Sequence, residues 1–460
     1  MKVVNKFCGG AAEILHEAIK WLLLGGVIGL VGGVIGALFH HEIGLASALR
    51  TAHPWLLYTL PLLGCVIVAL YQWGHMLPDR GTNRILDSVM NNEPIPKRVC
   101  GLMFVCTALT QLGGGSAGRE GAALQIGGSV GSFFSHRLGK RWLPRRSQRI
   151  GIMCGMTAVF SGLFGTPLTA VFFVLEVCEF GAMPQLAVIP CMIAAFVASY
   201  ASLLVGGSAT RITMVAMEPL TALLMLKAVV LGIGCGLVAM LFCEANHGAG
   251  KVYAKYIKNQ YIRGVTGGGA VILLTWMVGA TTYNGAGMEL VSLAEHGGAS
   301  WYSFLLKILF TAVTLGAGFK GGEIVPCFAV GALFGGAFAP LLGIEPALGA
   351  AVGMAAVFCG STNCLVASLV LGLEVCGGSA YLPVFAAACA VSQFVSGPCS
   401  LYASQKRVHP RLDLAEHESE QALTLLKRAP LSTMCWNISC GTPRSRAAYR
   451  PCLTTSAKPR

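Results

Sequence analysis

The chain has 460 residues, of which 55% are hydrophobic and only 12% are charged, and its formal net charge is +13. Soluble domains carry about 25% charged residues, so this composition excludes an ordinary soluble enzyme. Much of the positive charge lies after Ser404, which argues against a nucleic-acid partner. The remaining basic residues fit the cytoplasmic excess of Lys and Arg that is typical of membrane proteins.

The apolar stretches predict an all-α integral membrane protein. In chain order they cover about 21–39, 54–73, 99–113, 150–163, 167–178, 185–205, 219–243, 265–282, 302–317, 327–342, 347–359, 363–376 and 381–396. A straight helix needs about 20 residues to cross the hydrocarbon, so the shorter stretches predict tilted or re-entrant helices. Irregular backbone at membrane depth needs protein or water around it, so these helices predict a buried site at their ends.

The same pattern predicts three regions. Residues 1–20 are expected to form an N-terminal cytoplasmic segment, 21–405 the transmembrane transport domain, and 406–460 a polar, disordered cytoplasmic tail. We expect His40, His41 and Glu42 to end the first helix at the membrane interface. Most of the 18 cysteines lie singly in apolar runs, and neither CxxC nor HExxH occurs, so we expect small packed hydrophobes and no metal site.

Two pairs of segments predict an internal repeat. GGGSAGRE at 113–120 aligns with GAGFKGGE at 316–323, and LEVC at 175–178 recurs at 373–376. Transporters commonly build midplane sites from such repeats, so we expect halves at about 20–206 and 217–400. Glu176 and Glu374 end apolar runs, and we expect them to face water or to pair with basic residues.

Glu120 is the strongest candidate for chemistry. It follows a glycine-rich loop and opens an apolar segment, and intramembrane carboxylates usually mark ion or proton pathways. A helix N-terminus attracts anions, so a glutamate there is a tethered anion that competes with a diffusible one. Protonation would weaken the binding of the glutamate at the helix N-terminus and let the anion enter. The alternative is a carboxylate that simply pairs with Arg119 at an aqueous loop.

These motifs resemble those of the CLC chloride channels and proton-coupled transporters. GSAGREGAALQIG, which contains Glu120, resembles the gating-glutamate motif of that family, and Gly321 to Pro326 stands where the family has its anion-binding motif. Leu401-Tyr402 resembles the late tyrosine whose hydroxyl points at the central anion, although an interfacial aromatic anchor is the alternative. The resemblance covers about residues 20–405 and implies an inverted-repeat bundle of tilted and re-entrant helices.

Several positions depart from the usual family pattern. Thr82 replaces the central serine, Val177 stands at the internal proton-transfer glutamate, and Glu323 replaces an apolar residue. The last two resemble the fluoride-exporting branch of the family. Because Thr82 keeps a hydroxyl, chloride remains the alternative substrate.

The resemblance implies a homodimer in the lipid bilayer, with both termini cytoplasmic, in a bacterial inner membrane. It implies halide exchange for protons, with fluoride favoured, Glu120 as gate and proton acceptor, Glu323 as a candidate proton or anion contact, and no cofactor. The implied anion site comprises Gly81, Thr82, Asn83, Gly118, Arg119, Gly121, Gly322, Ile324, Val325 and Tyr402. Alternatives are a passive chloride channel of the same family and, in another class, a membrane-embedded enzyme that uses Glu120 and Glu323 as general acid and base.

Overall fold

The computed structural model describes residues 2–137, 148–178, 185–207, 219–377 and 379–405. The chain divides into two units, Met1–Val408 and His409–Arg460, and every described residue belongs to the first. The tail expected at 406–460 therefore lies outside the described residues.

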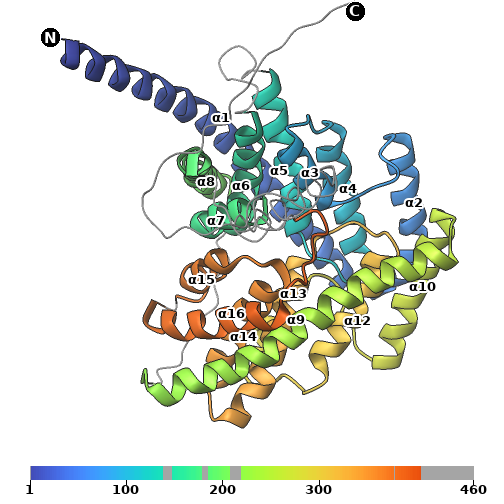
Figure 1. Cartoon of the computed structure of the whole chain (residues 1–460). Coiled ribbons are helices and arrows are strands. Elements are labelled where there is room, and N and C mark those ends of the chain that lie inside the picture. Colours follow the sequence, from blue (N-terminus) through green and yellow to red (C-terminus); the bar gives the residue numbers. More distant parts are fainter. Residues whose placement is uncertain (1, 138–147, 179–184, 208–218, 378, 406–460) are drawn as a thin grey trace, which may run out of the picture. The chain divides into compact units, whose positions relative to one another are not determined.

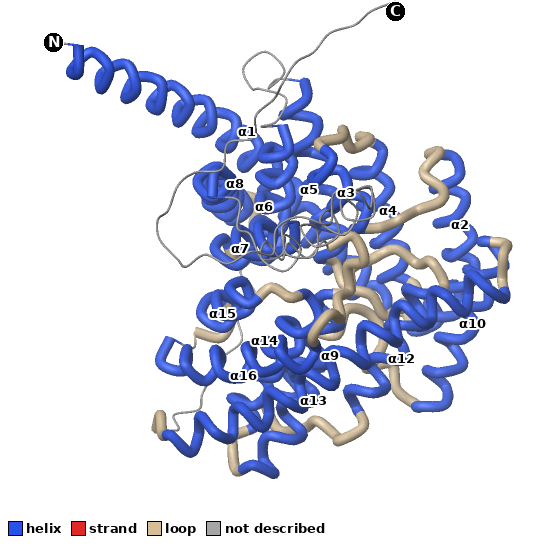
Figure 2. Tube along the Cα trace, in the orientation of Figure 1, coloured by secondary structure: helices blue, strands red, loops and turns tan. Residues whose placement is uncertain are grey.

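The described part of the chain consists of helices and connecting loops, without strands (Figures 1 and 2). The first half contains α1 (Lys2–Ala52), η1 (Pro54–Thr59), α2 (Leu60–Trp73), α3 (Thr82–Asn91), α4 (Arg98–Leu112), α5 (Glu120–Arg137), α6 (Gln148–Phe164), α7 (Pro167–Cys178) and α8 (Gln185–Leu204). The second half contains α9 (Ala222–Tyr256), α10 (Gln260–Val278), α11 (Met288–Glu295), α12 (Ser303–Gly316), α13 (Ile324–Phe338), η4 (Ala339–Leu342), α14 (Pro346–Thr362), α15 (Leu365–Glu374), η5 (Ser379–Tyr381) and α16 (Leu382–Ser396). The all-α membrane fold is confirmed.

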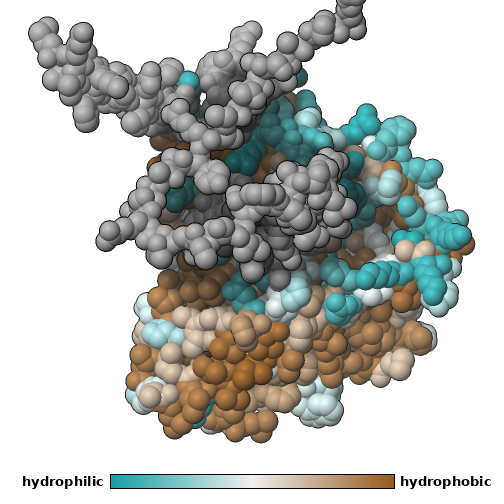
Figure 3. Space-filling model, in the orientation of Figure 1, coloured by the Kyte–Doolittle hydropathy of each residue, from teal (hydrophilic) through white to brown (hydrophobic). Residues whose placement is uncertain are grey.

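Seven helical segments among the described residues are long and apolar enough to cross a membrane. Shorter apolar helices of 10 to 17 residues lie between them, among them α7, α12 and α15. Figure 3 shows apolar side chains over the part of the visible face where α9 and α16 lie. Three helices, α3, α5 and α11, have no counterpart among the expected apolar stretches. The helix α3 is polar, α11 is short, and glycines and serines interrupt the apolar residues of α5.

The first helix does not end at His40 to Glu42, as we expected, but continues to Ala52. The residues at 43–52 are mostly alanine, leucine and arginine, which favour helix, and no proline occurs before Pro54. His40 therefore lies inside a continuous helix that packs against α4, α5, α6 and α8.

Glycines allow two equivalent helix pairs to pack backbone to backbone. A Cβ at Gly127 of α5 would lie 2.3 Å from the carbonyl oxygen of Gly155 of α6. In the second half, a Cβ at Gly331 of α13 would lie 2.5 Å from the carbonyl oxygen of Gly353 of α14. Neither approach tolerates a side chain, so these glycines bring together the helices behind the two glycine-rich loops.

Glu176 and Glu374 cap each other's helices, so our expectation that they face water or basic residues is wrong. Glu176, near the end of α7, accepts hydrogen bonds from Val366 N at 3.0 Å and Ala367 N at 2.8 Å, at the start of α15. Glu374, at the end of α15, accepts from Leu168 N at 2.9 Å and Thr169 N at 2.7 Å, at the start of α7. The two helices therefore run antiparallel, and the repeated LEVC segments have equivalent roles.

Candidate functional site

The two glycine-rich loops bond directly to each other. Gly118 N donates to the carbonyl oxygen of Gly322 at 2.6 Å, and Gly322 N donates to that of Gly118 at 2.7 Å. This exchange uses the N–H groups of both glycines, so they hold the loops together rather than face an anion. It places the N-terminus of α5 beside the N-terminus of α13.

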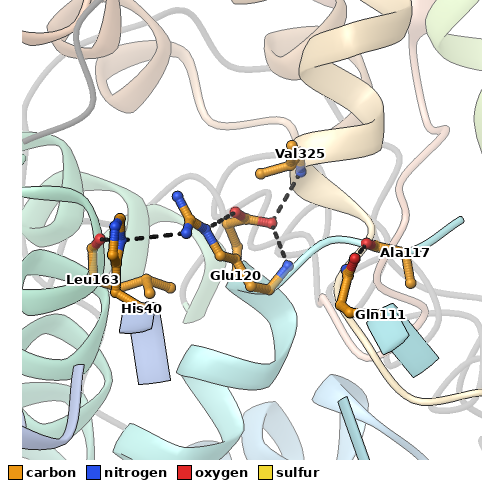
Figure 4. Close-up of polar contacts among 7 residues, drawn as sticks. His40, Gln111, Ala117, Glu120, Leu163 and Val325 are labelled. Carbon is orange, nitrogen blue, oxygen red and sulfur yellow. Dashed lines mark hydrogen bonds and ion pairs between the residues drawn. The ribbon is translucent and has the colours of Figure 1, made fainter. Parts of the chain in front are cut away.

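The carboxylate of Glu120 lies on the N-terminus of α13. The side chain is fully buried, and Oε2 accepts hydrogen bonds from Val325 N at 3.0 Å and from Arg119 N at 3.1 Å (Figure 4). Oε1 has no hydrogen-bond partner in the part of the chain that the structure describes. A carboxyl group thus occupies the backbone donors of a helix start, where anions are favoured.

A third helix start meets the same place. Gly81 precedes α3 with φ of 54°, a left-handed conformation that favours glycine, and Thr82 is the first residue of the helix. A Cβ at Gly121 would lie 3.0 Å from Gly322 Cα and 3.3 Å from Thr82 Oγ1, so the three helix starts converge around Gly121. Thr82 Oγ1 also lies 3.5 Å from Gln125 Nε2 of α5.

Tyr402 lies in the loop after α16 and is buried, which argues against the interfacial anchor. Its hydroxyl has no hydrogen-bond partner among the described residues. The side chain of Asn83 accepts a hydrogen bond from Ser404 N at 2.9 Å, so it fixes the loop that carries Tyr402. Leu401 N donates to the carbonyl oxygen of Ser361 at 2.9 Å and anchors the same loop on α14.

Glu323 is the N-cap residue of α13, but its side chain makes no capping hydrogen bond. Ile324 and Val325 follow it and are fully buried. Glu323 therefore stands at the same helix start on which the Glu120 carboxyl group lies.

Arg119 contacts a residue that the sequence pattern did not assign to the site. Its Nε lies 4.0 Å from Glu120 Oε1, and its Nη1 lies 3.2 Å from His40 Nδ1 (Figure 4). The guanidinium carbon also lies 5.2 Å from the centre of the Phe164 ring, in a cation–π contact. His40 was missed because we expected the first helix to end there.

Two further charged groups support the loops. Lys307 of α12 is fully buried, and its Nζ donates to Ser116 Oγ at 2.9 Å, in the loop before Glu120. Lys320, in the loop before Glu323, forms an ion pair of 2.7 Å with Asp79, in the loop before α3. A single lysine inside the apolar run 302–317 was the available signal for Lys307, whereas nothing in the sequence pairs Lys320 with Asp79.

Gln111 of α4 donates from Nε2 to the carbonyl oxygen of Ala117, which fixes the loop on its other side (Figure 4). No group of three or more His, Cys, Asp or Glu side chains that could hold a metal ion occurs among the described residues. A protonated Glu120 is neutral and no longer competes as an anion for the Val325 N–H. The arrangement therefore suits a small anion that takes this donor in its place.

The family model described as voltage gated chloride channel matches residues 63–397 of this sequence. The chain belongs to this family. Its membership confirms the resemblance in the motifs around Glu120 and Gly322, and it identifies the protein as a multi-pass integral membrane protein.

Two similar proteins have names that describe ion transport. The "Chloride/fluoride channel protein" of Pseudomonas syringae pv. tomato is 33% identical over 407 residues, which cover 87% of this chain and 89% of the relative. The "H(+)/Cl(-) exchange transporter ClcA" of Vibrio vulnificus is 27% identical over 393 residues, covering 77% of this chain and 82% of the relative.

Solved structures of the family share the fold. A crystal structure of a CLC-type fluoride/proton antiporter matches with a TM-score of 0.80 and 35% identity, covering 85% of this chain and 98% of that chain. A slow cyanobacterial Cl-/H+ antiporter matches with a TM-score of 0.70 and 22% identity, covering 88% of this chain and 99% of that chain.

Proposed function

We propose that this protein exchanges halide for protons across a membrane and favours fluoride over chloride. The observation that carries the proposal is the buried Glu120 carboxylate on Val325 N, at the start of α13. When Glu120 takes up a proton, the N–H of Val325 becomes available to a halide ion. The buried hydroxyl of Tyr402, which has no partner among the described residues, and that of Thr82 supply further donors. Gating and proton uptake are then one event at one carboxylate.

The preference for fluoride has a separate basis. Two relatives above 30% identity have fluoride in their names or titles. Glu323 adds a second acidic group beside the site, and as the neutral acid it could donate a hydrogen bond to a small ion. Fluoride is strongly hydrated and needs such close donors to replace its water. Glu323 is therefore proposed as an anion contact and as the second proton carrier.

The test of gating is Glu120→Gln in proteoliposomes. The amide is nearly isosteric with the carboxyl group but does not titrate, so halide efflux should persist while halide-driven proton movement is lost. An ion-selective electrode measures the halide, and a pH-sensitive dye measures the protons. Halide-driven proton movement that survives in Glu120→Gln would overturn the assignment of Glu120 as the gate. If the wild type itself shows no halide-driven proton movement, the protein conducts halide passively.

The test of selectivity compares fluoride and chloride efflux at equal gradients. We expect fluoride to leave faster, and chloride leaving at least as fast would reverse the proposed preference. Thr82→Ser is expected to shift the ratio towards chloride. An unchanged ratio would remove Thr82 from the selectivity filter. Glu323→Gln should fold normally and transport more slowly than the wild type. If this variant keeps the wild-type rate and stoichiometry, Glu323 has a structural role only.

We further propose a homodimer in a bacterial inner membrane, surrounded by lipid, with both termini in the cytoplasm. The basic cluster at 137–149 and the lysines near the loop between α9 and α10 support this orientation by the positive-inside rule. Accessibility of terminal tags in spheroplasts tests the orientation, and subunit counting by single-molecule photobleaching tests the dimer. Removal of the terminal tags by a protease added outside would contradict the orientation. Single bleaching steps would contradict the dimer.

A further inference from the structure

One nitrogen atom of His40 has two neighbours that make opposite demands on it. Nδ1 lies 3.2 Å from Arg119 Nη1 and 3.3 Å from the carbonyl oxygen of Leu163 (Figure 4). The guanidinium group can only donate, and the carbonyl group can only accept. Without a proton, Nδ1 accepts from Arg119, and with a proton it donates to Leu163. The protonation of this nitrogen therefore decides which neighbour His40 holds.

Arg119 has an alternative partner within reach. Its Nε lies 4.0 Å from Glu120 Oε1, beyond hydrogen-bond distance, while that oxygen is buried and has no hydrogen-bond partner among the described residues. The Phe164 ring, 5.2 Å from the guanidinium carbon, supports Arg119 in its present place. A small movement of the guanidinium group towards Glu120 would give Oε1 its missing donor.

We propose that protonation of His40 transfers Arg119 to Glu120, so that His40 acts as a proton-dependent brake on the gate. A protonated imidazole donates to Leu163 and places a positive charge beside the guanidinium group, which repels it. Arg119 then donates to Glu120 Oε1 and stabilises the ionised carboxylate on Val325 N. Glu120 leaves the site less often, and halide entry slows as the pH falls. This inference rests on the proposed gating role of Glu120.

The charged groups nearest His40 come from α1 itself and from the start of α5. Arg119 acts on it from the start of α5, and His41 lies on its own helix with the two ring centres 5.9 Å apart. Glu42 is also on α1. The other helices that pack on α1 are α4, α6 and α8, and they contain no acidic residue. Their basic residues, Arg98 and Arg149, stand at the starts of α4 and α6, whereas Leu163, which contacts His40, stands at the end of α6.

The experiment measures initial halide efflux from proteoliposomes with equal pH inside and outside, at pH 7.5 and pH 5.5. His40→Asn keeps an acceptor at the position of Nδ1 but cannot become charged. An ion pair changes the protonated fraction of a carboxyl group about tenfold or more. We therefore expect His40→Asn to match the wild type at pH 7.5 and to exceed it about tenfold at pH 5.5. A ratio that is the same at both pH values would overturn the proposal.

Three further variants make the result specific. His41→Asn is the matched control, because His41 is exposed on the same helix and does not contact Arg119 in the structure, and its ratio to the wild type should stay near one. His40→Lys carries a fixed positive charge and should be slow at both pH values. It also keeps the proposal testable if His40→Asn does not fold, because fast efflux from His40→Lys would equally overturn it. In Glu120→Gln, addition of His40→Asn should change nothing.

The same variants separate this inference from the proposed function. If Glu120→Gln retains halide-driven proton movement, the gating role itself fails. If Glu120→Gln loses proton movement while the ratio of His40→Asn to the wild type does not depend on pH, only the brake is excluded.

Discussion

The reciprocal caps of α7 and α15 predict unequal costs for two similar substitutions. Glu374 accepts three hydrogen bonds, from Leu168 N, Thr169 N and Thr169 Oγ1, whereas Glu176 accepts two, from Val366 N and Ala367 N. Glutamine keeps one oxygen and turns an amide group towards the remaining donor. Each substitution therefore loses one charge-assisted bond, and it converts the retained bonds to neutral ones.

The magnitude follows from the number of bonds. A hydrogen bond to a charged group contributes about 2 kcal/mol and a neutral one about 1 kcal/mol. Glu374→Gln loses one bond and weakens two, at a cost of about 4 kcal/mol, whereas Glu176→Gln loses one and weakens one, at about 3 kcal/mol. The two caps stand at opposite ends of a ten-residue helix, α15, about 15 Å long, so the costs should be additive in the double variant.

The assay is equilibrium unfolding in mixed micelles, with the free energy of unfolding compared among the variants. Glu244→Gln is the matched control, because Glu244 is exposed on α9, and it should change the free energy by less than about 0.5 kcal/mol. Costs for Glu176→Gln and Glu374→Gln that equal the control would refute the capping argument. A larger cost for Glu176→Gln than for Glu374→Gln would refute the bond count.

Three other predictions concern the supports of the site. Lys307→Met removes the donor to Ser116 Oγ and to the carbonyl oxygens of Tyr283 and Gly285, and should lower the free energy of unfolding by about 3 kcal/mol. Lys227→Met removes only an exposed hydrogen bond to the carbonyl oxygen of Gly343, and should cost less than about 1 kcal/mol in the same unfolding assay. Gly155→Ala should destabilise the α5–α6 contact, because a Cβ there would lie 2.2 Å from the carbonyl oxygen of Gly127. Gly26→Ala is the control, because a Cβ at Gly26 meets nothing within 4 Å. Equal thermal midpoints of the two variants in detergent would contradict this prediction. Burial opposes the charge of Asp79, but the Lys320 ammonium and the Gly81 N–H hold the pKa of its carboxyl group below the usual value. Because the pKa is lower in the folded state, the ionised carboxyl group stabilises the fold above the unfolded pKa of about 3.9, and this stabilisation is lost as the pH falls through the folded pKa. The wild type should therefore be more stable than Asp79→Asn by about 3 kcal/mol, constant from pH 7 to pH 5, and this difference should shrink as the pH falls below about 4. A constant difference down to pH 3 would contradict that assignment.

The sequence by itself determined the membrane class, most of the apolar helices and the repeat, and it singled out Glu120 as the candidate gate. Long apolar runs leave few alternatives in a bilayer, because every backbone polar group needs a partner there. Glu120 was recognisable because a carboxylate beside glycines in an apolar chain has few structural uses. The same local reasoning failed where the decisive partner is distant along the chain. Nothing near Glu176 or Glu374 indicates that each accepts hydrogen bonds from a helix start about 190 to 206 residues away.

Only the tertiary structure decided which groups meet at the site. Glu120 opens α5 but its carboxylate accepts from Val325 N of α13, and the side-chain oxygen of Asn83 on α3 holds the loop of Tyr402 through Ser404 N. His40 is an ordinary residue of a long helix until the fold brings Arg119 and Leu163 to the same nitrogen. The physical reason is that a helix start offers free N–H groups to any acceptor the fold delivers. The sequence shows that donors exist, and the packing of the two repeats selects the acceptor.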